Sequence, residues 1–129
     1  MWTAFIANNR TWTSIFGENY NPQELSISYA TLKDQSITLK LNSPIDPKNA
    51  PIKWIEKDYN EFEFELLLEQ IHLLDISNFN FYGPIRIAIE KNLSEHKIHL
   101  TISDRCTVNC KADGIFISNI NAYHNDYSE

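Results

Sequence analysis

The chain has 129 residues, of which 17 are acidic and 11 are basic, so its net charge is −6 at pH 7. A protein that neutralises phosphates needs clustered Lys and Arg, whereas the basic residues here are scattered, which argues against nucleic acid and anionic membrane surfaces as partners. The length fits one domain over residues 1–129, large enough to fold without a disulfide or a metal ion. With no apolar run long enough to span a membrane and no basic secretory-signal region at the N-terminus, we expect a cytoplasmic protein.

The first predicted element is a short helix near the N-terminus. Asn8 or Asn9 can cap it, because a side-chain oxygen at the cap accepts a backbone N–H of the first turn. The helix runs through Thr11–Phe16 and ends at Gly17, since glycine readily adopts the positive φ found at many helix ends.

Alternating apolar and polar residues follow, which indicates strands with one buried face. Leu25–Tyr29 and Ile37–Leu41 predict a hairpin around a turn at Asp34–Ser36. Three prolines make Ser43–Pro51 an irregular loop.

A long strand is predicted to begin at Glu61. Its alternation fails at Leu66–Leu68, which predicts a bend, a bulge or the start of a second strand. A helix over Glu65–Leu74 is the alternative, because Glu and Leu are good helix formers.

The C-terminal half predicts a second hairpin, formed by Ile85–Ile89 and Ile98–Ile102. Cys106–Cys110 continues the alternation. Asp113-Gly114 is a dipeptide typical of two-residue hairpin turns and leads to a last strand, Ile115–Tyr123. The remaining residues, 124–129, are expected to form a frayed tail.

Together these elements predict a mostly β (α+β) fold with a short N-terminal helix and about seven to nine strands. Most links between the strands are short, which implies antiparallel pairing. The expected architecture is a twisted sheet or a two-layer sandwich, with the helix over one edge or end.

Motifs for catalysis, cofactors and metals are not found in the sequence. The three glycines are isolated, so there is no phosphate-binding loop, and no G-x-S-x-G motif occurs. His96 and His99 point to opposite faces of a strand, which predicts solvated hairpin residues and no metal site. Cys106 and Cys110 lie about 13 Å apart along a strand, too far for a disulfide unless a turn joins them, so we expect reduced thiols. We therefore predict no enzymatic activity, no cofactor and no bound metal.

The strictest alternation in the chain is the acidic–apolar run that starts at Glu61. In a strand its apolar residues face the core, while Glu61, Glu63 and Glu65 stand together in solvent, with Glu69 beyond them. Such a face is either a solvated strand surface or a binding surface for a basic protein partner.

Aromatic residues leave a third possibility open. Trp2, Trp12 and Trp54 are interpreted as core residues. A carbohydrate- or small-ligand-binding β module could instead use exposed aromatic side chains, for which the candidates are Tyr20, Tyr59, Tyr82 and Tyr123.

Several short motifs occur in an order that resembles the immunity protein 50 family of bacterial polymorphic toxin systems. A helix bearing Trp12 runs into Ile15-Phe16-Gly17, and a Pro-containing loop leads to Pro51-Ile52-Lys53-Trp54. Tyr59-Asn60 opens the alternating strand, and the chain closes with Ile117-Ser118-Asn119-Ile120-Asn121-Ala122-Tyr123. The resemblance covers about Trp2 to Tyr123.

This resemblance implies a small, non-catalytic β protein, encoded beside a toxin gene, that binds and neutralises the toxin domain and protects the producing cell and its kin in contact-dependent competition. Many bacterial toxin domains are nucleases with basic clefts, so charge complementarity predicts a basic partner and an acidic binding face. The predicted partner-binding residues are Tyr59, as an anchor, with Glu61, Glu63, Glu65 and Glu69. A second acidic candidate near the C-terminus consists of Asp104, Asp113 and Asp126. The alternatives are the ligand-binding module and a structural subunit of a larger assembly.

Overall fold

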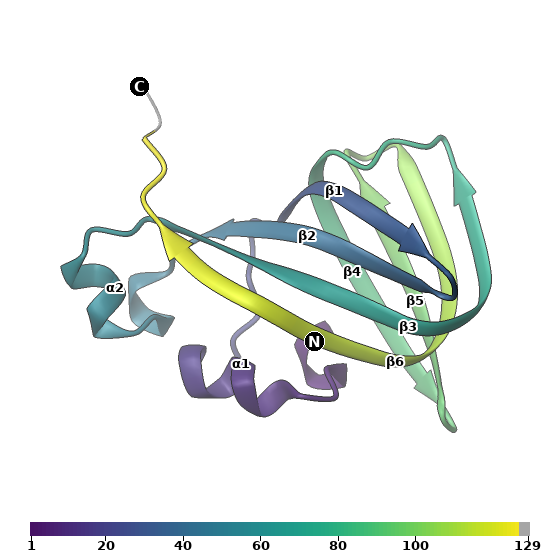
Figure 1. The fold of residues 1–129 in the computed structure, drawn as a ribbon, viewed down its shortest axis with the longest axis horizontal. Coiled ribbons are helices and arrows are strands. Elements are labelled where there is room, and N and C mark those ends of the chain that lie inside the picture. The colour runs from purple at the N-terminus through teal and green to yellow at the C-terminus, as the bar shows by residue number, and fades with distance from the viewer. Residues whose placement is uncertain (127–129) are drawn as a thin grey trace.

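A computed structural model describes residues 1–126 and shows one antiparallel sheet that closes into a barrel, with short helices around one end (Figure 1). Six strands follow the order β1-β2-β3-β6-β5-β4, and β4 returns to β1. The elements along the chain are η1 (Trp2–Phe5), α1 (Asn9–Phe16), β1 (Ser26–Lys33), β2 (Ser36–Pro44), η2 (Pro47–Asn49), α2 (Ile52–Glu56), β3 (Glu61–Ser77), β4 (Gly83–Asn92), β5 (Glu95–Ile102) and β6 (Cys106–Tyr123).

The predicted fold class is confirmed: the protein is mostly β, its strands are antiparallel, and a short helix precedes them. The strand count is lower than predicted, because β3 and β6 are single strands of 17 and 18 residues. The bend or bulge predicted at Leu66–Leu68 is not found, because these residues pair in unbroken register with β6 and Leu67 is simply an apolar residue on the outer face. The irregularities in the β3–β6 pairing lie instead between Glu63 and Glu65 and between Ile71 and Leu73. The alternative helix over Glu65–Leu74 is therefore wrong.

The hairpin predicted at Asp113-Gly114 is also wrong, since β6 continues through it. Gly114 is paired with Glu69 of β3 and does not adopt the positive φ that a two-residue hairpin turn requires. The positive φ values occur instead at Ser103 and Asp104, which form the turn between β5 and β6.

The predicted N-terminal helix and first hairpin are confirmed. Helix α1 begins after Asn8 and ends at Gly17, which has φ +84°. The turn between β1 and β2 contains Asp34 at φ 54°. Within the predicted irregular loop, η2 forms next to Asp46, whose side chain accepts a hydrogen bond from the Lys48 N–H at 3.1 Å.

The core of the barrel consists of alternate residues of every strand, joined at the helical end by stacked aromatic rings. Trp12 of α1 lies at its centre, with its ring centroid 4.5 Å from Phe16 and 5.2 Å from Phe64. Trp2 and Phe62 complete this cluster, so the aromatic residues of η1 and α1 close the end of the barrel where β4 and β5 do not reach. The interpretation of Trp2 and Trp12 as core residues is confirmed, and Trp54 packs half-buried against the core.

The two predicted hairpin histidines differ in their surroundings. His99 is exposed, and its Nδ1 lies 2.8 Å from Asn109 Oδ1. His96 was predicted to be solvated, but it is buried and its ring meets Phe5 edge-on at 6.2 Å. The reason is that His96 lies opposite Ala112, on the inward side of β5.

The tail beyond β6 was predicted to fray from His124 onward. In the described part, Asn125 N–H donates to Asn60 Oδ1 at 2.6 Å, and Asn60 Nδ2 donates to the Asn125 carbonyl at 2.8 Å. His124 also lies within hydrogen-bonding distance of the Asp58 carbonyl. These contacts hold 124–125 against the start of β3, while 127–129 lie outside the described residues.

Candidate partner-binding face

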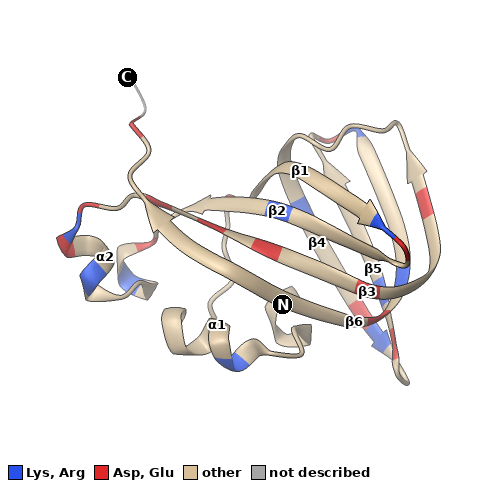
Figure 2. Ribbon diagram, viewed as in Figure 1, with Lys and Arg blue, Asp and Glu red and all other residues tan. Residues whose placement is uncertain are grey.

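The predicted acidic residues belong to β3, and Figure 2 shows acidic positions along this strand, which lies between β2 and β6. Phe62, Phe64, Leu66 and Leu68 are buried inside the barrel, so the residues between them point outward. The structure thus places Glu63, Glu65 and Glu69 on one face, which is called the acidic face below.

Glu61 begins β3 but does not stand in solvent as predicted, because it is buried with 7% of its surface exposed. Its Oε1 accepts hydrogen bonds from the Tyr123 hydroxyl and from Asn125 Nδ2. Glu61 therefore joins the start of β3 to the end of β6, which is a structural role.

The other three carboxylates are half-buried and differ in their partners. Glu63 forms an ion pair with Lys40 of β2 at 3.1 Å. Glu65 Oε1 accepts hydrogen bonds from Ser118 Oγ at 2.9 Å and Asn119 Nδ2 at 2.8 Å, both from β6. No hydrogen bond or ion pair of Glu69 is found within residues 1–126. Negative charge on this face is thus only partly compensated by Lys40.

The predicted anchor Tyr59 lies in the turn between α2 and β3, and it is half-buried. Its N–H donates to the Trp54 carbonyl at 3.0 Å, and Lys57 Nζ lies 6.0 Å from its ring centroid. Tyr59 is therefore beside α2 at the end of the acidic face.

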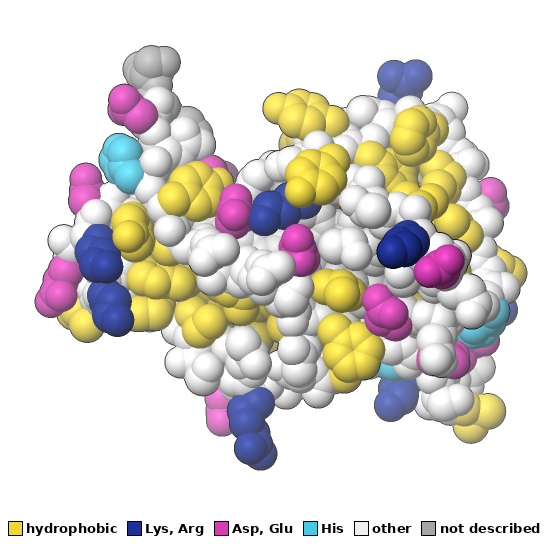
Figure 3. Space-filling view, in the orientation of Figure 1, with side chains coloured by type: hydrophobic (Ala, Val, Ile, Leu, Met, Phe, Trp, Pro, Cys, Tyr) yellow, Lys and Arg dark blue, Asp and Glu magenta, His cyan; other side chains and the backbone are white. Residues whose placement is uncertain are grey.

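Two aromatic residues on this face were not predicted from the sequence to be part of the binding surface. Tyr29 of β1 is paired with Lys40 and is 55% exposed. Phe116 of β6 is paired with Leu67 and is 39% exposed. Hydrophobic and acidic side chains accordingly lie next to each other on the face seen in Figure 3. Only the strand register, which the sequence does not show, reveals that these residues are neighbours of the acidic ones.

The second acidic candidate does not form a cluster. Asp104, in the β5–β6 turn, is paired with Arg86 at 2.6 Å. Asp113 lies 3.3 Å from His72 Nε2, midway along β6, and Asp126 follows the end of that strand. An extended strand advances about 3.4 Å per residue, so the three carboxylates are spread along the length of the barrel.

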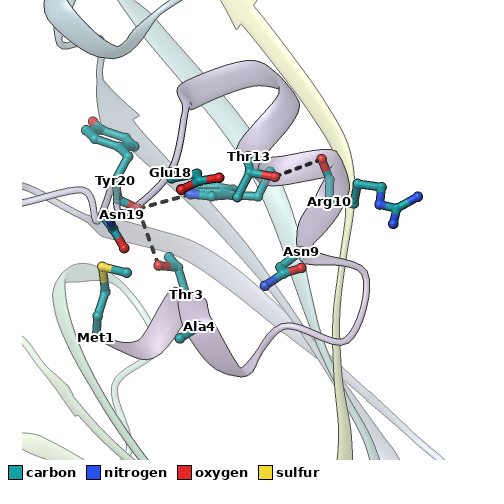
Figure 4. A pocket seen from close by; sticks show the side chains of 10 residues that line it. Met1, Thr3, Ala4, Asn9, Arg10, Thr13, Glu18, Asn19 and Tyr20 are labelled. Carbon is teal, nitrogen blue, oxygen red and sulfur yellow. Dashed lines mark hydrogen bonds between the residues drawn. The ribbon is translucent and has the colours of Figure 1, made fainter.

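A hollow of about 350 Å³ lies between η1, α1 and the loop that follows α1 (Figure 4). At its wall, the Tyr20 carbonyl accepts hydrogen bonds from Trp12 Nε1 at 3.1 Å and Thr3 Oγ1 at 3.3 Å, so these groups already have partners. The Arg10 side chain extends away from the hollow. The tyrosines proposed for a ligand platform are also separated, because Tyr20 stacks on Phe16 in the aromatic cluster and Tyr123 bonds Glu61.

Both cysteines are buried free thiols on the inner side of β6. Burial raises the pKa of the Cys110 thiol to about 11, so it stays protonated at neutral pH. Within residues 1–126, no group of three or more His, Cys, Asp or Glu side chains is arranged to hold a metal ion. Over the same residues, no helix has the length and apolar character needed to cross a membrane.

The family model for immunity protein 50 matches residues 8–123. The chain belongs to the immunity protein 50 family. The resemblance seen in the sequence, about Trp2 to Tyr123, is thereby confirmed over nearly its whole extent. Searches of curated proteins and of solved structures each gave no significant match. In this immunity protein 50 member, α1 and all six strands lie within the matched residues.

Proposed function

We propose that this protein is a non-catalytic immunity protein that binds a cognate bacterial toxin domain in the cytoplasm and neutralises it by protein–protein contact. The observation that carries the proposal is the match of the immunity protein 50 family to residues 8–123. Family membership supports a role in neutralising a toxin. The grouping of carboxylates on the acidic face supports this face as the surface that contacts the toxin domain.

The binding surface in this proposal is the acidic face, and the partner is a basic toxin domain such as a nuclease. Glu63, Glu65 and Glu69 share this face, where Lys40 lies across from Glu65 in the strand register and forms an ion pair with Glu63. Complementary charge steers association and can raise its rate to about 10⁸ M⁻¹s⁻¹ at low salt. Because a nuclease presents cationic groups to phosphates, an acidic surface is suited to cover such a site.

The test uses the toxin domain encoded by the neighbouring gene, inactivated in its catalytic site. A charge-reversed variant, Glu63→Lys with Glu65→Lys and Glu69→Lys, is compared with a control carrying Glu24→Lys, Glu56→Lys and Glu90→Lys. The control changes the net charge equally at exposed positions off the acidic face. We expect calorimetry to show weaker binding and a shallower salt dependence for the first variant only.

Two results would contradict the proposal at different levels. Equal affinities and salt dependences for both variants would exclude the acidic face while retaining the immunity function. Failure of the wild-type protein to bind the toxin domain would exclude neutralisation of that toxin by direct contact.

A further inference from the structure

We infer that Phe116 is the anchor of the toxin-binding face and that it receives an Arg or Lys side chain of the toxin domain, held between the carboxylates of Glu65 and Glu69. This inference rests on the proposed function and names the chemistry of its contact.

The strand register places the ring between the two carboxylates. Phe116 is paired with Leu67, and the outward neighbours of Leu67 on β3 are Glu65 and Glu69. Same-face neighbours on a strand are about 6.5–7 Å apart, so Glu65 and Glu69 each lie about that far from Leu67 and roughly 13 Å from each other, on either side of the position that Phe116 faces. On the next strand, Thr38 is paired with Leu67 and Lys40 is paired with Glu65, and the Lys40 ammonium forms its ion pair with Glu63 at 3.1 Å.

The Phe116 ring lies over Gly114, two residues before it on β6. A Cβ atom at Gly114 would lie 2.8 Å from Phe116 Cε1 and 3.4 Å from Cζ, so the ring occupies the space that any larger residue would fill. Because the ring is already positioned, binding loses less side-chain entropy than it would with a mobile anchor.

The charges around the ring select the chemistry of the partner. Both hydrogen bonds to Glu65 go to Oε1, which fixes the carboxylate and leaves Oε2 without a donor in the described part of the chain. Lys40 is engaged by Glu63 at 3.1 Å, and Lys33 is separated from Glu69 by β2. An uncharged partner would bury these carboxylates without compensation, which is unfavourable. Arg and Lys instead offer an apolar stem and a cation that an aromatic face attracts.

The inference is tested by calorimetry with the inactivated toxin domain. Phe116→Leu keeps an apolar side chain over Gly114 but removes the aromatic face, so we expect affinity to fall by about 2- to 30-fold while the fold is retained. Phe79→Leu is the matched control, since Phe79 is 73% exposed in the β3–β4 linker, and it should bind like the wild type. Glu65→Gln with Glu69→Gln should reduce both the affinity and its salt dependence.

The outcomes separate the inference from the function on which it rests. If the wild type binds and Phe116→Leu, Phe116→Ala and the double Gln variant all bind equally well, the inference is overturned and the immunity function stands. If the wild type forms no complex, both are overturned. Circular dichroism of each variant establishes that a loss of binding does not come from unfolding.

Discussion

Asn8 joins the N-terminal segment to the sheet through its side chain. Its Nδ2 donates to the Ile117 carbonyl at 2.9 Å, and its Oδ1 accepts from the Ile117 N–H at 3.0 Å. Asn8→Ala leaves both backbone groups of a buried residue without partners, so we expect a loss of about 1–3 kcal/mol in unfolding free energy. Asn9→Ala at the exposed neighbouring position is the control for urea denaturation. Equal midpoints for the two variants would contradict this role of Asn8.

Cys110 makes the stability of the fold depend on pH in the alkaline range. Its thiol pKa is raised from 9.0 to about 11 in the folded protein by burial. As the pH rises from 9 towards 11, the unfolded chain loses this proton first, so the free energy of unfolding must fall. Below pH 9 the thiol is protonated in both states and contributes no pH dependence.

The contribution of this thiol is measured by urea denaturation between pH 8 and 11. The wild type should lose more stability over that range than Cys110→Ala, in which the other titrating groups are unchanged. Identical slopes for the two proteins would show that Cys110 does not have a raised pKa.

At the scale of elements, the junction between the β3–β4 linker and the β5–β6 turn depends on Gly83. Gly83 has φ +117°, and a Cβ there would lie 2.2 Å from Ser103 Oγ, which itself donates to the Tyr82 carbonyl at 2.7 Å. Gly17 also has a positive φ, +84°, but no atom within 4 Å of its Cβ position.

Substitution of the two glycines separates backbone strain from steric overlap. Gly17→Ala should cost about 1–3 kcal/mol through strain alone. Gly83→Ala should cost at least about 1 kcal/mol more, because Ser103 must also move and its hydrogen bond is disturbed. Thermal denaturation of both variants measures the difference, and a milder effect at Gly83 would contradict it.

Elements with local signals could be predicted from the sequence, and those set by distant residues could not. The helix start after Asn8, the stop at Gly17 and the turn at Asp34 are local and are found, but the Asn8 side chain bonds Ile117 and makes no capping hydrogen bond to the helix. Asp113-Gly114 has the composition of a turn, yet pairing with β3 keeps it extended. Long-range pairing also determines the number of strands, because β3 continues through Leu66–Leu68 and β6 through Asp113-Gly114, where the sequence predicts a break.

In the candidate site too, features set by neighbouring residues could be predicted and features set by distant residues could not. The alternation correctly predicted that Phe62 and Phe64 face the core while Glu63 and Glu65 lie on the other face of the strand. It could not show that Glu61 is buried by Tyr123, since their contact joins residues far apart in the sequence. For the same reason it could not identify Phe116 as a neighbour of Glu65 and Glu69.

At the scale of the whole molecule, the weakest part of the barrel is the seam between β1 and β4. Among residues 1–126, β1 and β4 are paired only at Ser26 with Pro84 and at Ile27 with Gly83. Leu32 lies opposite the inward-facing Ile37 and is nevertheless 52% exposed, so the seam opens beyond its first residues.

Amide hydrogen exchange should be faster along the unpaired edges of β1 and β4 than in the centre of the sheet. Amides on the free edges of β1 beyond Tyr29 and of β4 beyond Ile85 should exchange at least about 100-fold faster than those of Leu66 and Leu68, which lie between β2 and β6. Mass spectrometry or NMR would resolve the two groups. Uniform protection across the six strands would contradict an open seam.

The most direct test of the immunity function is the survival of cells that produce the active toxin domain of the neighbouring gene together with this protein. We predict that the wild type restores growth and co-purifies in a one-to-one complex with the inactivated toxin, whereas the variant with Glu63, Glu65 and Glu69 changed to Lys protects less. Cell death at wild-type levels of the folded protein, without a complex, would contradict neutralisation by direct binding.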